Sequence, residues 1–124
     1  MREFAVVYLI GAIGYSLIEI LWRGYTHWTM SVTGGAAFLL LYLIDQNMQE
    51  KALILRAIAG AIIITFVELI AGCIINLVFH LDVWDYSNHA GNILGQICPM
   101  YCVLWFFLCI SVMPLGRWIR LIIR

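Results

Sequence analysis

The chain has 124 residues, of which 65% are hydrophobic and only 11% are charged, and its formal net charge is zero. Soluble domains are roughly half apolar and about a quarter charged, so this composition excludes a water-soluble domain and indicates an integral membrane protein. The neutral charge and the lack of a basic cluster argue against nucleic acid as a partner.

The apolar residues form continuous runs and do not alternate with polar ones, which favours membrane-spanning helices over a β-barrel. A helix needs about 20 apolar residues to cross the hydrocarbon core. Four stretches approach or reach this length, namely residues 4–22, 28–44, 57–79 and 93–113. The first exceeds the apolar core of a signal peptide, so we expect it to be a span. The sequence therefore predicts an all-α bundle of four transmembrane helices in a single membrane domain, residues 1–124.

The distribution of lysine and arginine predicts that both termini lie on the cytoplasmic side. With the N-terminus inside, the cytoplasmic residues are Arg2, Lys51, Arg56, Arg117, Arg120 and Arg124. Only Arg23 would lie outside, and a bias of this kind sets the orientation of proteins with short loops. Residues 80–92 would then form an outer loop.

Pro114 and Gly116 are expected to end the fourth span. Residues 114–124 then form a tail in which Arg117, Arg120 and Arg124 share one face of a helix. This pattern is typical of an amphipathic segment on the inner leaflet, where anionic lipids attract arginine.

Polar side chains gather toward the expected outer ends of the spans, whereas the cytoplasmic halves are almost purely apolar. Glu68 lies near the middle of the third span, roughly 17 Å from its outer end at ~1.5 Å per residue. Glu19, Asn76 and Gln96 lie only about 5 Å deep on the same count. The pattern predicts an outward-open polar vestibule, with a substrate-binding lining formed by Glu68, Glu19, Arg23, Asn76 and Gln96.

A carboxylate at mid-membrane costs at least about 2.5–3.5 kcal/mol, so we expect Glu68 to face the bundle interior. Thr65, Glu68, Gly72 and Asn76 recur at helical spacing and form one polar stripe. Two interpretations are open. Either Glu68 binds a solute or exchanges a proton for a cation, or a protonated Glu68 hydrogen-bonds a neighbouring helix as part of the packing.

Glu19 and Arg23 stand four residues apart on the first span, in the order that favours an ion pair. One interpretation is an interfacial salt bridge. The other is that an anionic ligand group meets Arg23 while Glu19 orients the guanidinium.

The connection between the third and fourth spans is the longest polar stretch, and it carries His80, Asp82, Asp85 and His89. Two imidazoles and two carboxylates are suitable ligands for a transition metal, although their spacing matches no standard metal motif. The alternative is that Asp85 and Ser87 bond backbone amides in a turn.

The two halves of the chain echo each other. W-T-M-S-V-T-G-G from Trp28 and W-D-Y-S-N-H-A-G from Trp84 share Trp, Ser and the last Gly at the same spacing. Each follows a span with a glutamate, Glu19 in one half and Glu68 in the other. The echo indicates a parallel tandem repeat of two helix pairs.

Several short motifs resemble one bacterial family. They are G-Y-S-L-I-E-I-L-W-R from Gly14, E-L-I-A-G from Glu68, W-D-Y-S from Trp84, G-N-I-L-G-Q-I-C-P from Gly91, and Trp105. Together they are similar to the family named Putative ABC-transporter type IV, the CmpB-like permeases. The resemblance implies a small polytopic protein of the bacterial inner membrane that acts as a permease component, with no catalytic residues to carry over.

We therefore expect a transporter or permease component that binds a small solute or cation and needs no cofactor. The chain contains no G-x-x-x-x-G-K-[ST] motif, so an ATPase would be a separate chain. Four helices make a thin wall, so a homodimer or a partner membrane subunit would complete the pathway. The alternatives are a membrane enzyme acting on a lipid or head group at the outer face, and a structural or regulatory subunit.

Overall fold

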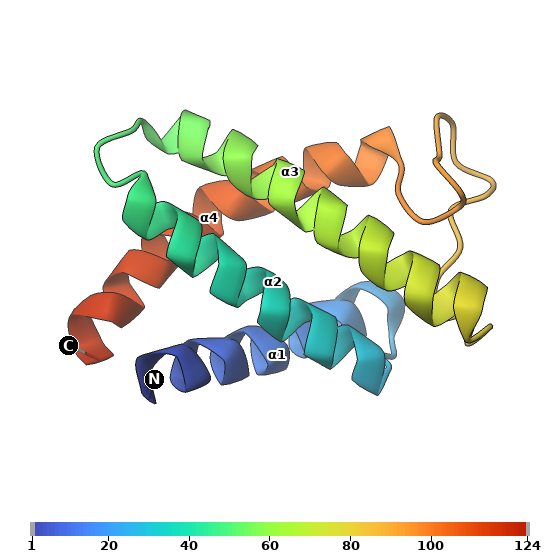
Figure 1. Ribbon diagram of the computed structural model, residues 1–124, viewed down its shortest axis with the longest axis horizontal. Coiled ribbons are helices and arrows are strands. Elements are labelled where there is room, and N and C mark those ends of the chain that lie inside the picture. The colour runs from blue at the N-terminus through green and yellow to red at the C-terminus, as the bar shows by residue number, and fades with distance from the viewer. Residues whose placement is uncertain (1, 124) are drawn as a thin grey trace. The chain divides into compact units, whose positions relative to one another are not determined.

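The computed structural model describes residues 2–123 and consists of four long helices (Figure 1). They are α1 (Arg2–Arg23), α2 (Trp28–Asn47), α3 (Leu53–Gly72), which runs on into a π-helical segment η1 (Cys73–Val78), and α4 (Pro99–Ile123). Over this part of the chain, the only strand-like pairing is an isolated bridge between Ile93 and Ile97. The prediction of four membrane-spanning helices is confirmed, because α1, α2, α4 and the combined segment Leu53–Val78 are all long and apolar enough to cross a bilayer.

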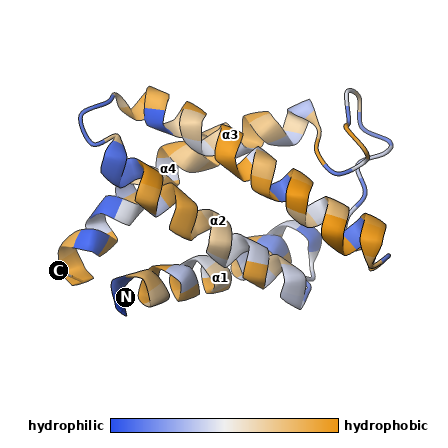
Figure 2. Cartoon of the chain, in the orientation of Figure 1, coloured by the Kyte–Doolittle hydropathy of each residue, from blue (hydrophilic) through white to orange (hydrophobic). Residues whose placement is uncertain are grey.

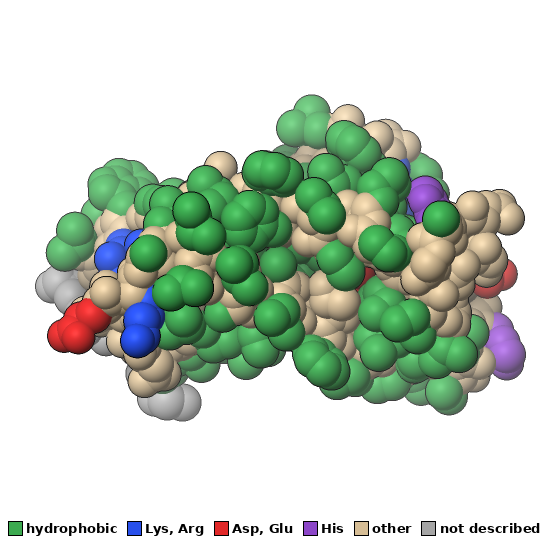
Figure 3. Space-filling model, turned by 90° about the horizontal axis from the view of Figure 1, so that it is seen from above, with side chains coloured by type: hydrophobic (Ala, Val, Ile, Leu, Met, Phe, Trp, Pro, Cys, Tyr) green, Lys and Arg blue, Asp and Glu red, His purple; other side chains and the backbone are tan. Residues whose placement is uncertain are grey.

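Apolar residues dominate every helix (Figure 2) and much of the visible molecular surface (Figure 3). Leu21 is 87% exposed and Trp22 is 66% exposed. In water such exposure would be unfavourable, whereas in a bilayer these side chains meet lipid tails of the same polarity. An α-helix pairs its own backbone polar groups, which is what a membrane span requires.

The chain divides into two compact units, which are described separately. Unit 1 contains the described residues 2–51 and 112–123, and unit 2 contains residues 52–111. Helix α4 contributes its first part to unit 2 and its last part to unit 1.

Unit 1 is built on close packing of α1 against the antiparallel helix α2. Gly34 and Gly35 on α2 face two tyrosines of α1. A Cβ atom at Gly34 would lie 2.6 Å from Tyr15 Cβ, and one at Gly35 would lie 2.8 Å from Tyr8 Cζ. The missing side chains therefore allow the two backbones to approach closely, as small residues do between membrane helices.

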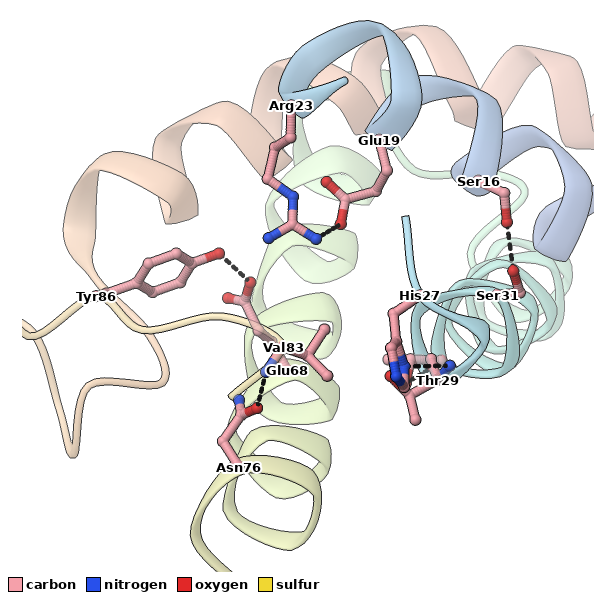
Figure 4. Close-up of polar contacts among 11 residues, drawn as sticks. Ser16, Glu19, Arg23, His27, Thr29, Ser31, Glu68, Asn76, Val83 and Tyr86 are labelled. Carbon is pink, nitrogen blue, oxygen red and sulfur yellow. Dashed lines mark hydrogen bonds and ion pairs between the residues drawn. The ribbon is translucent and has the colours of Figure 1, made fainter. Parts of the chain in front are cut away.

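The turn between these helices has local causes. Gly24, at φ 86°, ends α1 with a hydrogen bond from its N–H to the carbonyl oxygen of Ile20 at 2.8 Å. His27 then caps α2, because its Nδ1 accepts a hydrogen bond from the N–H of Thr29 at 3.2 Å. Farther along the pair, Ser16 and Ser31 share a hydrogen bond of 2.5 Å between their hydroxyls (Figure 4).

The fourth helix differs from the sequence prediction at both ends. It begins at Pro99, not near residue 93, because Leu94 and Gly95 have positive φ and interrupt any helix there. It also continues to Ile123 through Pro114 and Gly116, so the prediction that these residues end the span is wrong. Proline lacks an N–H and usually breaks a helix, but here α4 is helical on both sides of it.

Two of the three arginines in the predicted tail, Arg117 and Arg120, meet a buried acid. Asp45 of α2 accepts a hydrogen bond from Arg117 Nε at 2.9 Å, and Arg120 Nη2 lies 3.7 Å from the same oxygen. The side chain of Asp45 is only 3% exposed. This ion-pair cluster fixes the end of α4 to α2 within unit 1. Arg124, the third arginine of the predicted face, lies outside the described residues.

The two segments of the sequence echo have different conformations. Residues 28–35 are the first turns of α2, whereas residues 84–91 belong to the non-helical connection between η1 and α4. The sequence similarity therefore has no local structural counterpart.

We predict that Gly34→Ala lowers the free energy of unfolding by about 1–3 kcal/mol, the usual cost of overpacking. Gly14→Ala is the matched control, because a Cβ at Gly14 of α1 meets nothing within 4 Å and alanine favours a helix over glycine by about 0.5–1 kcal/mol. Unfolding by sodium dodecyl sulfate in mixed micelles measures both. Equal stability of the two variants would contradict the packing described.

Candidate functional site

The centre of unit 2 is the carboxylate of Glu68, which lies on α3 and is only 8% exposed. Its Oε2 accepts a hydrogen bond from the hydroxyl of Tyr86 at 3.0 Å (Figure 4). Its Oε1 accepts one from the indole Nε1 of Trp105 at 3.3 Å. Glu68 therefore faces into unit 2, as its cost in a membrane span requires.

Several aromatic rings pack around Tyr86 and Trp105, the two side chains that donate hydrogen bonds to the carboxylate. The ring of Tyr86 stacks on that of Tyr101, with centroids 4.7 Å apart and planes 11° apart. The ring of His89 meets both tyrosines edge-on, at 5.5 Å from Tyr86 and 5.9 Å from Tyr101. Trp105 follows one helical turn after Tyr101 on α4, with centroids 6.2 Å apart. These rings come from the connection and from α4, so together they bring two segments of the chain to Glu68 on α3.

The polar stripe predicted on α3 faces the rest of unit 2. Thr65 donates a hydrogen bond to Cys102 Sγ at 3.3 Å, one turn before Glu68. After Gly72 the helix changes to the π-helical segment η1, which carries Asn76. π-Helical turns are rare in proteins, and those that occur are frequently found at functional sites.

Asn76 and Gln96 hold the connection against the end of this helix. Asn76 Nδ2 donates to Gln96 Oε1 at 2.8 Å, and Asn76 Oδ1 accepts from the N–H of Val83 at 2.7 Å. Gln96 Nε2 donates to the carbonyl oxygen of Leu94 at 2.9 Å. Both side chains are buried and each of their polar atoms has a partner, so the two amides belong to the structure of the connection.

Gly72 makes this arrangement sterically allowed. A Cβ atom there would lie 2.5 Å from Gln96 Oε1 and 2.9 Å from Trp84 Cζ2. The buried indole of Trp84 also donates to the carbonyl oxygen of Gln96 at 3.1 Å. The connection therefore lies directly on the helix surface at Gly72, one turn beyond Glu68.

The remaining motif residues shape the turn that carries Tyr86. Asp85 accepts hydrogen bonds from both the hydroxyl and the N–H of Ser87, the latter at 2.9 Å. Asn92 donates to the carbonyl oxygens of Ser87 and His89, at 3.1 Å and 2.9 Å. The N–H of Tyr86 donates to the carbonyl oxygen of Gly95 at 2.7 Å. The W-D-Y-S and G-N-I-L-G-Q motifs thus form one turn network with Tyr86 at its inner side.

The metal interpretation of the connection gains no support from these contacts. Within residues 2–123, no group of three or more His, Cys, Asp or Glu side chains is placed to hold a metal ion. Asp85 is engaged by Ser87, as the turn interpretation predicts, and His89 packs on tyrosine rings. His80 and Asp82 are exposed and have positive φ.

Glu19 and Arg23 form the ion pair that their spacing predicts, in unit 1. Arg23 Nη2 lies 3.0 Å from Glu19 Oε1, and the two side chains are 21% and 9% exposed (Figure 4). The guanidinium also lies over the ring of Tyr25, 4.6 Å from its centroid. These contacts order both charged groups on α1.

Sequence reasoning identified Glu68 but not the side chains that contact it. Tyr86 stands in the polar connection and Trp105 in the apolar fourth span, and no spacing marks either of them as a neighbour of Glu68. The signal that could have found Tyr86 and Trp105 is that both lie in the motifs that carry the family resemblance.

The fold and the buried acid define the class of the protein as a multi-pass α-helical membrane protein with a polar site inside one unit. The sequence model of the family described as "Putative ABC-transporter type IV" matches residues 6–120, which is nearly the whole chain. The chain therefore belongs to this family, and the membership is consistent with a role as a transporter or permease component. No curated protein and no solved structure matches the chain.

We predict that Ser87→Ala raises the pKa of Asp85. Two hydrogen bonds from Ser87, first the hydroxyl and then the N–H, hold the pKa of this exposed carboxyl below its ordinary value. Because the pKa of Asp85 is lowered in the folded state, its ionised carboxylate stabilises the folded turn at any pH above the ordinary pKa of the group. This contribution disappears as the pH falls through the folded pKa. Carboxyl ¹³C NMR titration in micelles measures the midpoint, with the neighbouring Asn88→Ala as control. An unchanged midpoint in Ser87→Ala would remove the assigned cause.

Proposed function

We propose that the chain is the membrane-spanning component of a transporter, and that Glu68 is the group that binds its small solute or cation. The observation that carries this proposal is a nearly buried carboxylate inside a membrane-spanning helix, with a hydrogen-bond donor at each oxygen. Ionisable groups are retained at such positions mostly where they act on a solute or a proton. Membership of an ABC-transporter-type family supports the same role.

In this proposal Asn76 and Gln96 act as positioning residues. Their hydrogen bonds hold the connection on η1 and so place Tyr86 at Glu68. Glu19 and Arg23 form a separate ion pair on α1, within unit 1. The excess of lysine and arginine at the other ends of the spans orients the connection toward the outside of a bacterial inner membrane.

The proposal includes partners. An ABC-type transporter couples its membrane component to ATP hydrolysis, which we assign to a separate chain. A second copy or another membrane subunit would supply the helices that complete the path. The competing account is a structural subunit in which Glu68 serves only packing.

We predict that Glu68→Gln slows transport strongly without preventing assembly. Glutamine keeps an acceptor oxygen for Tyr86 or Trp105 but loses the charge, and a charge-assisted hydrogen bond contributes about 1.5–3 kcal/mol. To identify the solute, untargeted mass spectrometry compares the growth medium of source cells that carry the gene with the medium of cells that lack it. The solute that distinguishes these strains should be transported at least about tenfold more slowly in Glu68→Gln.

Glu50→Gln is the control, because it removes an exposed carboxylate in the connection between α2 and α3. It should leave transport and the amount of protein in the membrane unchanged. Normal transport in Glu68→Gln would establish the packing role. A deletion strain that handles every solute normally would exclude the transport function itself.

A further inference from the structure

Two arginines near the end of α4 share a single carboxylate oxygen. Asp45 Oδ2 accepts a hydrogen bond from Arg117 Nε at 2.9 Å, but it lies 3.7 Å from Arg120 Nη2, which is beyond hydrogen-bond distance. Within residues 2–123, neither Nε nor Nη2 of Arg120 has a hydrogen-bond partner, although both atoms are buried. Buried donors without an acceptor are costly, so we expect an acceptor to reach them when the cluster is complete.

The two unpaired nitrogens of Arg120 lie on one edge of its guanidinium. Such an edge donates two parallel hydrogen bonds to the oxygens of one carboxylate or phosphate. The carboxylate of Asp45 is close to this edge but is bonded to Arg117. Asp45 also lines a cavity of about 10 Å³ with Tyr42 and Gly116, which gives its carboxylate room to turn. Asp45 can therefore complete Arg120 if another anion binds Arg117.

Arg117 is the arginine of this pair that a ligand can reach. Its side chain is 34% exposed, whereas that of Arg120 is 11% exposed. Arg117 Nη2 donates to the carbonyl oxygen of Gln49 at 2.9 Å, and neither this contact nor the one with Asp45 uses Nη1. An anion that approaches Arg117 therefore meets a guanidinium that is already held in place.

The position of the cluster along α4 indicates the source of this anion. Helix α4 has 25 residues, so at ~1.5 Å per residue it is about 37 Å long and exceeds the hydrocarbon core of roughly 30 Å. The end that carries Arg117 and Arg120 is charged and therefore belongs in the headgroup layer. The neighbouring Trp118, Leu121 and Ile122 are exposed, and tryptophan is enriched in this layer. A phospholipid here would have its phosphate beside the arginines and its acyl chains beside these apolar side chains.

The charges at this end of unit 1 also favour an anion. The N-terminal end of α1 meets the C-terminal end of α2 there, because Tyr42 donates a hydrogen bond to Glu3 (Figure 1). Among the described residues at these ends and at the end of α4, the basic side chains are Arg2, Lys51, Arg117 and Arg120, and the acidic ones are Glu3, Asp45 and Glu50. One positive charge remains, which a singly ionised phosphodiester would neutralise.

We infer that Arg117 and Arg120 form a binding site for the phosphate of an anionic phospholipid. The phosphate binds Arg117, and the carboxylate of Asp45 turns onto the open edge of Arg120, so that each guanidinium has an anion of its own. Bound lipid thereby strengthens the cluster that joins α4 to α2. The site lies in unit 1 and does not depend on the function proposed for Glu68, which lies in unit 2.

The test measures competition for the full chain in non-ionic detergent. The reporter is the fluorescence anisotropy of a phosphatidylglycerol that carries a fluorophore on one acyl chain. The competitors are dioleoylphosphatidylglycerol, which is anionic, dioleoylphosphatidylcholine, which has the same acyl chains and no net charge, and inorganic phosphate, which has no acyl chains. We expect phosphatidylglycerol to compete at least about tenfold more strongly than either of the others. Equal competition by phosphatidylcholine would overturn the inference, and equal competition by inorganic phosphate would overturn the assignment to a lipid.

Variants assign the binding to these two arginines. Arg117→Gln removes the guanidinium that meets the phosphate, and Arg120→Gln removes the edge that receives Asp45. Each should weaken phosphatidylglycerol binding at least about tenfold. Arg2→Gln is the matched control, because it removes an exposed cation from the same end of unit 1, and it should leave binding within a factor of about two. An equal loss in Arg2→Gln and Arg117→Gln would show that the lipid responds only to total charge, and the site assignment would fail.

Size-exclusion chromatography of each variant separates lost binding from lost folding. Arg120 is largely buried, so Arg120→Gln is the variant at greater risk of misfolding. If it does not elute as a single sharp peak, Arg117→Gln alone decides the question, because Arg117 is partly exposed. Unchanged affinity for phosphatidylglycerol in folded Arg117→Gln contradicts the inference.

Discussion

The contact of the connection with Gly72 is the constraint on which the site in unit 2 depends. Trp84 and Gln96 occupy the space that a side chain at this position would fill. Because they can lie on the helix backbone, Gln96 reaches Asn76 and the turn that follows Trp84 delivers Tyr86 to Glu68. A single missing methyl group thus couples the folding of the connection to the environment of the buried acid.

The polar groups near this contact satisfy one another, which is a strong requirement close to lipid. An unpaired amide or carbonyl costs several kcal/mol in hydrocarbon. Asn76 accepts from the backbone of Val83 and donates to Gln96, and Gln96 in turn donates to Leu94. Removing Asn76 or Gln96 would leave other groups without partners, so these two amides and the backbone groups of Val83 and Leu94 act as a unit. The π-helical segment η1 takes part in the same hydrogen-bond network because Asn76 lies within it.

The sequence predicts the helices well and their contacts poorly, for physical reasons. Long apolar runs are sufficient to predict membrane spans, because the hydrocarbon core of the bilayer favours an apolar side chain at almost every position of a span. The start of α4 was predicted too early because Leu94 is apolar but adopts a positive φ. The end of α4 was predicted too early because proline usually breaks a helix, whereas the sequence does not reveal that Arg117 and Arg120, beyond Pro114, pair with Asp45.

In the candidate site, too, some residues are predictable from the sequence and their contacts are not. Glu68 was predictable because a carboxylate is conspicuous among apolar residues. Its neighbours Tyr86 and Trp105 were not, since no periodicity relates a non-helical connection or a later helix to α3. The pairing of Asn76 with Gln96 was likewise out of reach, because two amides 20 residues apart give no sign in the sequence that they bond each other.

The most direct test of the central claim is the reactivity of Glu68 toward a hydrophobic carbodiimide, measured by peptide mass spectrometry in Gly72→Ala. The account predicts that the added methyl group displaces Gln96 and Trp84 and so frees Tyr86 from Glu68. The carboxyl should then react at least about tenfold faster, because the loss of this hydrogen bond and of the burial of the carboxyl corresponds to about 1.4 kcal/mol or more. Gly14→Ala should leave the reactivity unchanged. An unaltered labelling rate in Gly72→Ala would show that the connection does not depend on this contact.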